Sequence, residues 1–335
     1  MLLGRLQDGV PVCERPFAEL GAACGLAEAE VLERVRRLKR ERIIRQISAI
    51  FDTRSLGYRS SLVAARVDPA RVEAAAAVVS GHPGVSHNYL RNHPFNLWFT
   101  IAVGPASRFG LAGTVALLHR LSGAESTRLL PALQVYKIGV RFDVGGEGRP
   151  DDRAGSPGAA AGGAEPVPLT PAEIGFVREM QRDLVLVERP FAEIAGRLGV
   201  ALGELAATHE RFLASGRMRR FAAVLHHRRA GFRANAMGVW AGPDDAAELD
   251  RLGAVMAGFR AVSHCYRRPT FPDWPYNLFT MVHGRSEAEC RETLAAIAQA
   301  TGIDRRAALD SLREFKKERV RYFTAEEREW EERHG

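Results

Sequence analysis

The hydrophobic and polar positions of this chain change period several times, and the same order of periods occurs in both halves. In each half, apolar side chains recur at helical spacing in two successive segments, and a third segment alternates as a strand does. The three segments are 16–24, 27–41 and 43–51 in the first half and 190–198, 202–215 and 218–225 in the second. Two helices joined by a tight turn and followed by a β-strand are typical of a winged helix-turn-helix. A further helix opens the second half, with Thr170 as its N-cap and Pro171 at its first position.

A second pattern follows each of these units. Its order is strand, helix, two strands of a hairpin, helix and strand, which predicts a ferredoxin-like β-α-β-β-α-β unit in each half. The segments are 61–67, 69–80, 84–91, 95–103, 109–121 and 129–142 in the first half, and 234–240, 244–259, 261–268, 276–283, 287–300 and a strand within 312–323 in the second.

Matching phrases confirm that the two halves are copies of one another. Glu14–Glu19 recurs unchanged at Glu188–Glu193, and Val-Ser-His-Asn-Tyr-Leu-Arg at Val85–Arg91 returns as Val-Ser-His-Cys-Tyr-Arg-Arg at Val262–Arg268. A duplication on this scale predicts a pseudo-symmetric pair of units with an internal interface available to a ligand.

The predicted fold is therefore α+β, a tandem repeat that forms a pseudo-dimer within one chain. Residues 145–168 are rich in Gly, Ala and Pro, have little apolar surface to bury, and are expected to form a flexible linker. The expected units are winged helix-turn-helices at 1–50 and 169–225, ferredoxin-like domains at 51–144 and 226–323, and a charged C-terminal tail at 324–335.

The charge balance favours a polyanionic partner. A net charge of +7 suits nucleic acid, an anionic membrane surface or a multiply carboxylated molecule. No apolar run approaches the roughly 20 residues of a membrane span, and no signal-peptide pattern opens the chain, so we expect a cytoplasmic protein. The four cysteines show no metal-binding spacing and are expected to be reduced thiols.

The two predicted recognition helices differ in charge. The first carries a basic stripe of Arg34, Arg36, Arg37, Lys39, Arg40 and Arg42, whereas the second contains Glu204 and Glu210 and few cations. A symmetric DNA reader presents both recognition helices to half-sites. This difference argues against DNA as the partner and favours a structural or dimerising helix-turn-helix.

The repeated hairpin phrase carries the candidate chemistry. Alternate residues of a strand share a face, so His87, Tyr89 and Arg91 point one way in the first half. His264, Tyr266 and Arg268 form the corresponding face in the second half. Histidine can act as a general acid and arginine forks onto carboxylates, which suits a carboxylated substrate that must receive a proton. The alternative is a solvated sheet face on which the histidine only packs or caps.

Two features belong to the second half only. An insertion at 269–275 holds Phe271 and Trp274 between prolines, which predicts either a stiff wall for a flat ring system or a rigid surface loop. His227 and Arg228 belong to a basic cluster that could bind carboxylates or form a solvated turn. His93 and His283 have weaker claims as ligand or proton donor.

The order of units resembles that of the Lrp/AsnC regulators, over nearly all of both halves. The hairpin phrases, extended by Asn-Leu-Trp-Phe-Thr at 96–100 and Asn-Leu-Phe-Thr at 277–280, resemble instead the siroheme decarboxylases. These are Lrp/AsnC-like proteins of the alternative heme route and of the pathway to the special heme of nitrite reductase. Two homologous subunits usually pair in that family, and here both are expected in one fused chain.

The resemblance implies a carboxy-lyase that removes carbon dioxide from two acetate side chains of siroheme, leaving methyl groups. It implies no permanent cofactor, since the iron tetrapyrrole is the substrate, and a homodimer of the fused chain or association with related decarboxylase subunits. The implied proton donors are His87 and His264. The implied substrate-binding residues are Arg91, Arg267 and Arg268 as carboxylate clamps, Tyr89 and Tyr266 as orienting groups, and Phe271 and Trp274 at the border of the macrocycle. His227 and Arg228 of the basic cluster are further candidates for binding the substrate.

Because the insertion and the basic cluster occur once, we expect one main cavity, built largely on the second half and completed by the first. Binding of the siroheme iron by one of these histidines would compete with a role as proton donor. Two other functions use the same fold: a transcription regulator that responds to heme or a small molecule, and a carrier that hands siroheme onward without chemistry.

Overall fold

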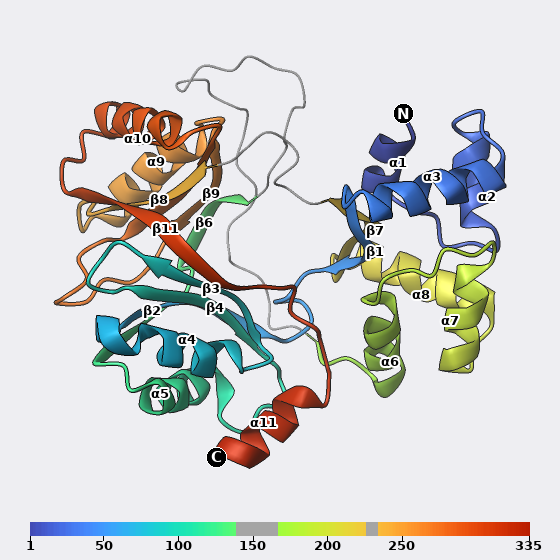
Figure 1. Ribbon diagram of the computed structural model, residues 1–335, viewed down its shortest axis with the longest axis horizontal. Helices are drawn as coiled ribbons and strands as arrows, with labels where there is room; N and C mark the ends of the chain where they lie inside the picture. The colour runs from blue at the N-terminus through green and yellow to red at the C-terminus, as the bar shows by residue number, and fades with distance from the viewer. Residues whose placement is uncertain (139–166, 226–233) are drawn as a thin grey trace.

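Two regions make up the molecule in the computed structural model, which describes residues 1–138, 167–225 and 234–335. One region holds the helix-turn-helix units of both halves, and the other holds a large sheet with helices on its outer side (Figure 1). The predicted fold class is confirmed. Most of the predicted linker at 145–168 lies outside the described residues.

The helical region contains three helices and one strand from each half. Proline occupies the first turn of α2, α6 and α7, where its missing N–H has no intrahelical partner to lose. Thr170 caps α6 as predicted, in a capping box with Glu173. The elements are α1 (Leu2–Asp8), α2 (Pro16–Ala22), α3 (Glu28–Arg40) and β1 (Ile44–Phe51), then α6 (Pro171–Met180), α7 (Pro190–Leu198), α8 (Leu202–Ala214) and β7 (Met218–Leu225).

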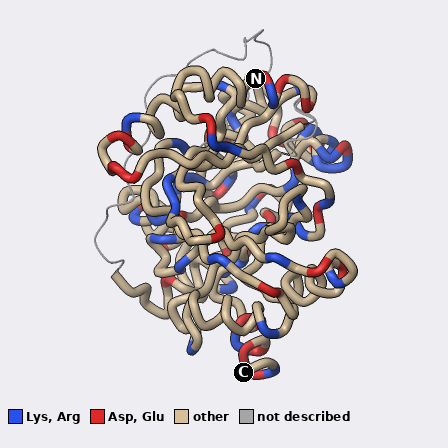
Figure 2. Tube along the Cα trace, turned by 90° about the vertical axis from the view of Figure 1, so that its left-hand side faces the viewer, with Lys and Arg blue, Asp and Glu red and all other residues tan. Residues whose placement is uncertain are grey.

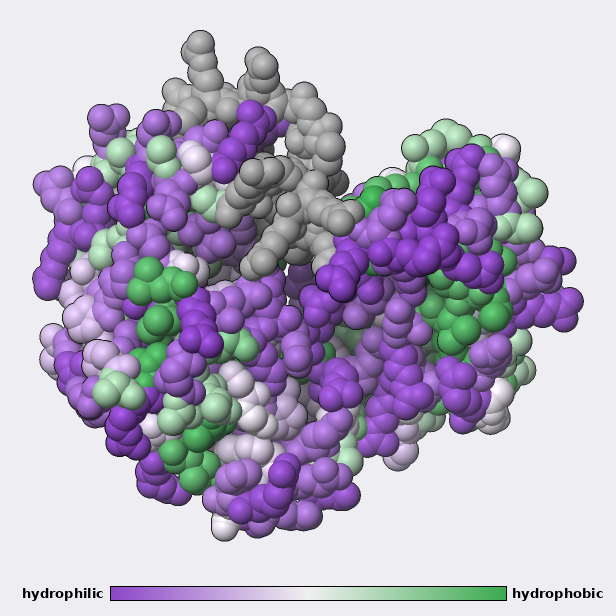
Figure 3. All heavy atoms as spheres, in the orientation of Figure 1, coloured by the Kyte–Doolittle hydropathy of each residue, from purple (hydrophilic) through white to green (hydrophobic). Residues whose placement is uncertain are grey.

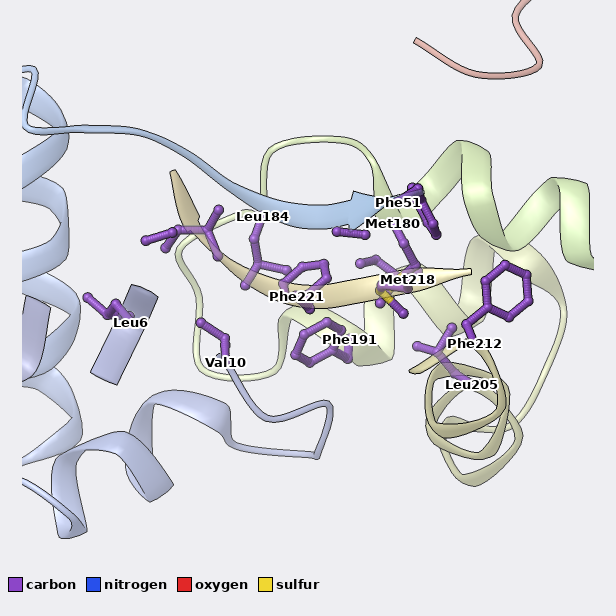
Figure 4. Close-up of a cluster of buried hydrophobic side chains, with 14 of the residues drawn as sticks. Leu6, Val10, Phe51, Met180, Leu184, Phe191, Leu205, Phe212, Met218 and Phe221 are labelled. Carbon is purple, nitrogen blue, oxygen red and sulfur yellow. The ribbon is translucent and has the colours of Figure 1, made fainter. Parts of the chain in front are cut away.

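The strand that follows each helix-turn-helix pairs with its counterpart in the other half. β1 and β7 form a two-stranded antiparallel sheet in which Ile47 lies opposite Ala223. Side chains of both halves pack around it in one core (Figure 4). Phe51 of β1, for example, meets the ring of Phe212 of α8 edge to face at 6.1 Å. These strands therefore join the halves.

The repeated Glu-Arg dipeptide marks the pseudo-twofold relation between the halves. Arg189 pairs with Glu14 at 3.3 Å, and Arg15 pairs with Glu188 at 3.0 Å. All four side chains are about half exposed or more, so each pair contributes at most about 1 kcal/mol. Their value is geometric, because reciprocal contacts of this kind identify a self-complementary interface.

The basic stripe of α3 is largely engaged in contacts with nearby groups. Lys39 binds the carboxylate of Asp183 at 2.7 Å, and Arg36 donates to the carbonyl of Leu186 at 2.8 Å. Both partners belong to the second half. Lys and Arg are interspersed with Asp and Glu along the trace in Figure 2. These contacts give the stripe a structural role between the halves.

The second region is a single nine-stranded sheet with the order β5-β2-β4-β3-β11-β8-β10-β9-β6. Helices α4 and α5 cover the strands of the first half, and α9 and α10 cover those of the second (Figure 1). The strands are β2 (Arg59–Arg66), β3 (Val85–Arg91), β4 (Leu97–Val103), β5 (Ser126–Leu130), β6 (Gln134–Ile138), β8 (Ala234–Trp240), β9 (Val262–Arg267), β10 (Leu278–Gly284) and β11 (Arg306–Lys317). The helices are α4 (Val72–Ser80), preceded by the short 3-10 helix η1 (Pro69–Arg71), α5 (Gly110–Ser122), α9 (Ala246–Ala257) and α10 (Glu287–Thr301).

The last strand of each half crosses to the other half. β11 pairs with β8 through its first part and with β3 through its second part. The first half ends in two short strands. Of these, β5 pairs with β2 of the same half, and β6 pairs with β9 of the second half. Only Pro131, Ala132 and Leu133 separate β5 from β6, which are the two outer strands of the order. This short connection brings the two ends of the sheet near each other, and the repeated faces of β3 and β9 line one cavity.

The C-terminal segment contains a helix that the sequence did not predict. Trp330 of α11 (Glu326–His334) is 3% exposed and meets the ring of His82 at 4.4 Å. The buried carboxylate of Glu331 accepts a hydrogen bond from Ser107. α1 was also not predicted, and β11 begins six residues before the predicted 312–323. Among the described helices none has the length and apolar character needed to cross a bilayer.

Candidate functional site

A cavity of about 1960 Å³ lies between the nine-stranded sheet and the β1–β7 strand pair. The surface is hollowed between the two regions in Figure 3. Both repeated faces line this cavity, together with residues of β4, β10 and the end of β1. The lining residues of the two faces are His87, Tyr89 and Arg91 from β3 and its end, and His264, Tyr266 and Arg268 from β9 and the residue after it.

The strand alternation that the sequence predicts is present on both strands. Asn88 and Cys265, which lie between the histidine and the tyrosine of each face, are fully buried and bind the covering helices instead. Asn88 donates to the carbonyl of Ala76 in α4 at 3.1 Å, and the thiol of Cys265 donates to the carbonyl of Gly253 in α9 at 3.6 Å. These contacts fix the register of each strand and hold the histidine faces toward the cavity.

Each cavity histidine is held by the serine that precedes it. His87 Nδ1 lies 2.9 Å from Ser86 Oγ, and His264 Nδ1 lies 2.8 Å from Ser263 Oγ. In both halves the tyrosine two residues on stacks against the imidazole, with ring centroids 6.1 Å apart. Neither Nε2 has a hydrogen-bond partner within the described residues. This leaves Nε2 as the nitrogen able to meet a substrate.

Both histidines are neutral near pH 7. Burial lowers the pKa of His87, and the nearby charge of Lys317 lowers it further. Burial and the guanidinium of Arg268 lower the pKa of His264 to about 4. A neutral imidazole whose Nδ1 accepts from serine carries its proton on Nε2.

The two cavity arginines also match across the halves. Arg91 Nη1 donates to the carbonyl of Leu309 at 2.7 Å, and Arg268 Nη1 donates to that of Leu130. The Nε atoms of both are buried and have no acceptor within the described residues. Burial lowers the pKa of each guanidinium to about 10, so both stay protonated.

Neither arginine forms an ion pair with a carboxylate in the described part of the chain. A buried positive charge without a counter-ion is costly, and a carboxylate ligand would relieve that cost through charge-assisted hydrogen bonds. The site can therefore hold a multiply carboxylated ligand between two neutral imidazoles. Among the described residues no group of His, Cys, Asp and Glu has the arrangement of a metal site.

Comparison with known proteins identifies the family. Residues 55–137 and 229–316 match a model of the AsnC-like ligand binding domain, and residues 1–45 match a model of the siroheme decarboxylase NirDL-like HTH domain. The chain is 39% identical to a siroheme decarboxylase of Hydrogenobacter thermophilus, over 98% of this chain and 96% of that protein. The chain belongs to the siroheme decarboxylase family.

A solved structure of this family extends the likeness to three dimensions. The crystal structure of the siroheme decarboxylase NirDL in co-complex with an iron-uroporphyrin III analogue superposes with a TM-score of 0.79, at 35% identity, over 99% of this chain and 96% of that one. The siroheme decarboxylase beta subunit of Methanosarcina barkeri is 40% identical over 44% of this chain and 97% of its own length. One half of this chain thus corresponds to a whole subunit of that relative.

Arg267 was predicted as a carboxylate clamp of the siroheme decarboxylase site, and the structure corrects this. It does not line the cavity. Its side chain lies on the helix-covered face of β9, where it pairs with Asp250 of α9 at 3.3 Å. Strand alternation is the reason, because Arg267 falls between the cavity-lining Tyr266 and Arg268.

The predicted aromatic border of the macrocycle is also corrected. Trp274 is fully buried and meets the rings of Phe95 and Trp98 of the first half at 5.6 and 5.2 Å. Phe271 stacks beneath the guanidinium of Arg128 at 5.3 Å. Neither aromatic lines the cavity. The insertion reaches across to the first half and joins the core between the halves, behind Trp98, which does line the cavity.

His227 and Arg228 lie outside the described residues. Of the two weaker histidine candidates, His93 packs against Trp274 at 5.2 Å and does not line the cavity, whereas His283 does.

Several residues of the site escaped the sequence analysis. Ser86 and Ser263 precede the histidines in both copies, so their repetition was a usable signal. Lys317 and Glu314 come from β11, where they lie opposite His87 and Tyr89. Arg59 reaches the cavity from β2. The last three could not be found in advance, since they depend on the crossing of β11 and on which face of β2 turns inward.

Proposed function

We infer that this protein is a carboxy-lyase that removes carbon dioxide from two acetate side chains of siroheme and yields didecarboxysiroheme. One observation carries the inference in a chain of this family: two neutral histidines line a single cavity with two buried arginines that have no counter-ion among the described residues. The relative with a bound iron-uroporphyrin III analogue supports a tetrapyrrole as the ligand. A multiply carboxylated substrate also accounts for the positive net charge.

In the proposed binding mode, Arg91 and Arg268 hold the carboxylates. Their carbonyl contacts at Leu309 and Leu130 fix each guanidinium while its remaining N–H groups face a ligand. Tyr89 and Tyr266 stack beside the histidines and limit where an acetate can lie. Because the arginines stay charged, the carboxylates remain ionised until they leave as carbon dioxide.

In the proposed reaction, the bond between the acetate methylene and its carboxylate breaks, and the electron pair passes to the tetrapyrrole ring. The methylene carbon then forms a bond to a proton and becomes a methyl group. We propose His87 and His264 as the proton donors, through Nε2. The iron tetrapyrrole accepts the electrons as the substrate, so no resident cofactor is proposed.

The decisive experiment is anaerobic incubation of the purified protein with siroheme, followed by mass spectrometry. The expected product has lost two carbon dioxide units. Siroheme binding without mass loss would indicate a carrier. Binding to DNA, with neither siroheme binding nor mass loss, would indicate a regulator.

The proposed proton donors are tested by single substitutions. His87→Ala and His264→Ala should bind siroheme with nearly unchanged affinity and lose about 100-fold or more in turnover, since a positioned general acid contributes about that much. Absorbance titration measures binding, and product mass measures turnover. Normal turnover by both variants would show that the assignment is wrong.

One fused chain supplies both faces of the cavity, so the proposed active unit needs no second copy. Association into a homodimer or with related subunits is an additional expectation, which light scattering of the purified protein tests.

A further inference from the structure

The two cavity faces match in their repeated residues and differ in what surrounds them. The backbone N–H of Ala102 donates to the carbonyl of Gly84, and that of His283 donates to the carbonyl of Ala261, so Ala102 and His283 occupy equivalent positions. Opposite His87 and Tyr89 stand Lys317 and Glu314, whereas opposite His264 and Tyr266 stand Ile138 and Val135. On the neighbouring strand, charged residues stand opposite the first face and apolar residues stand opposite the second.

Among the described residues, a chain of three hydrogen-bonded side chains occurs in the second half and has no counterpart in the first. His283 Nε2 lies 2.9 Å from Ser263 Oγ, and the same oxygen lies 2.8 Å from His264 Nδ1. Ser263 can accept a proton from His283 and donate one to His264, because a hydroxyl does both. Both serines also lie near a backbone carbonyl, Ser263 near that of Met281 at 3.2 Å and Ser86 near that of Thr100 at 3.4 Å, but in the first half the chain of side chains stops at Ser86.

We propose that His283 and Ser263 form a proton relay to His264, and that the relay serves one of the two decarboxylations. The proposal rests on the function proposed above. His264 Nε2–H protonates the methylene carbon, while Nδ1 takes the proton of Ser263 and Ser263 takes the Nε2 proton of His283 in its imidazolium form, which is left as a neutral imidazole. Solvent water then returns a proton to His283. Ser263 and His283 act through His264 and are positioning residues.

The relay answers a specific chemical difficulty. A neutral imidazole that gives up its Nε2 proton becomes an imidazolate, which is a costly anion in a buried site. Simultaneous proton uptake at Nδ1 avoids this anion and leaves the other neutral tautomer. His264, whose pKa burial lowers to about 4, has this need and has a donor behind it. In the first half, Lys317 stands opposite His87 and Glu314 stands opposite Tyr89 instead. The two histidines therefore regain their protons by different routes.

His283→Gln is the sharpest test, because a glutamine amide can still donate a hydrogen bond to Ser263 but does not relay a proton. We expect siroheme affinity within about twofold of the parent protein and one carbon dioxide lost at the normal rate. The second loss should slow at least about tenfold, below the full effect of a general acid, so that a product lacking one carbon dioxide accumulates. His283→Ala should show the same stall, and added imidazole should relieve it.

The matched control is His119→Gln. His119 forms a comparable bond to a hydroxyl, Nδ1 to Thr127 Oγ1 at 3.0 Å, but does not line the cavity. Its product should have lost both carbon dioxide units. The relay is excluded if His283→Gln completes both losses at the parent rate, slows both equally, or loses affinity with turnover. If the unsubstituted protein releases no carbon dioxide, the proposed function itself fails, which is a separate result.

Discussion

Arg267 and Arg268 are neighbours in sequence and have opposite surroundings. Arg268 is 9% exposed, lines the cavity and has no carboxylate partner in the part of the chain that the structure describes, whereas Arg267 pairs with Asp250 beneath α9. Strand alternation alone predicts this difference. Arg267 was predicted as a clamp because of its residue type. Its position in the strand decides instead which face its side chain occupies, and that face lies away from the cavity.

This contrast yields a prediction for Arg268→Met. The substitution removes a buried charge, which stabilises, and leaves the carbonyl of Leu130 without its donor, which destabilises. We expect the two effects to offset, so that the free energy of unfolding changes by less than about 2 kcal/mol. The Kd for siroheme should rise at least about tenfold, because a hydrogen bond to a charged group contributes about 1.5–3 kcal/mol.

Arg267→Met is the control, one residue away and outside the cavity. Its siroheme affinity should equal that of the parent protein. Absorbance titration and urea unfolding of both variants make the measurement. Equal loss of affinity in the two variants would contradict the assignment of Arg268 as a carboxylate clamp.

At the residue scale, the sequence was informative where chemistry repeats locally. The faces of His87 and His264 follow from alternation and duplication, and both line the cavity as the alternation requires. Trp274 was misplaced because an aromatic among prolines is equally compatible with a cavity wall and with a core. Only its burial against Trp98 of the other half distinguishes the two, and that contact is invisible in sequence.

At the element scale, α11 shows why a charged segment can still fold onto the protein. Trp330 is its one large apolar side chain, so no helical period of apolar residues announces the helix. Its docking depends on a surface formed by His82 and Ser107 of the first ferredoxin-like unit. The docked helix lies against His82, which is fully buried. The Nδ1 atom of His82 accepts a hydrogen bond from the backbone N–H of Gly84 at 3.0 Å.

Burial of His82 predicts a dependence of stability on pH. Burial, with smaller contributions from Lys316 and His334, lowers the pKa of His82 from 6.5 to about 3. Between these values the unfolded chain binds a proton that the folded chain excludes, so stability falls as the pH falls through this window. One such histidine contributes a slope of up to about 1.4 kcal/mol per pH unit.

His82→Gln should reduce that slope, whatever its effect on stability at neutral pH. Urea unfolding between pH 7 and pH 4 measures the slope for the parent protein, His82→Gln and the control His119→Gln. The control should keep the parent slope. An unchanged slope in His82→Gln would mean that other groups, such as the buried His264, carry the acid sensitivity.

At the scale of the whole molecule, the halves are joined by more than the chain segment between them. β1 pairs with β7, β11 with β3, and β6 with β9, so three strand pairs cross from one half to the other. The duplication predicted two units and a shared cavity. It could not predict the crossing, because alternation specifies the two faces of a strand but not its neighbours.

The crossing strands predict that the halves stay together after the chain between them is cut. A protease site placed at residues 155–160 of the full-length protein allows the cut to be made after folding. The tether raises the effective concentration of the halves to the millimolar range, but the strand pairs and the shared core around Trp274 should hold them without it. A separated half would lack the partner strands that the other half supplies. Separation would therefore expose unpaired strand edges and the shared core, which disfavours it.

We therefore expect the cut protein to elute as one species containing both fragments and to remove both carbon dioxide units from siroheme at the parent rate. The same protein left uncut is the control for the inserted site. The relative that is a separate beta subunit matches one half of this chain, which is consistent with assembly from two pieces. Separation of the fragments at micromolar concentration, with loss of turnover, would show that the strand pairs alone do not maintain the cavity and that covalent fusion is what keeps the two histidine faces together.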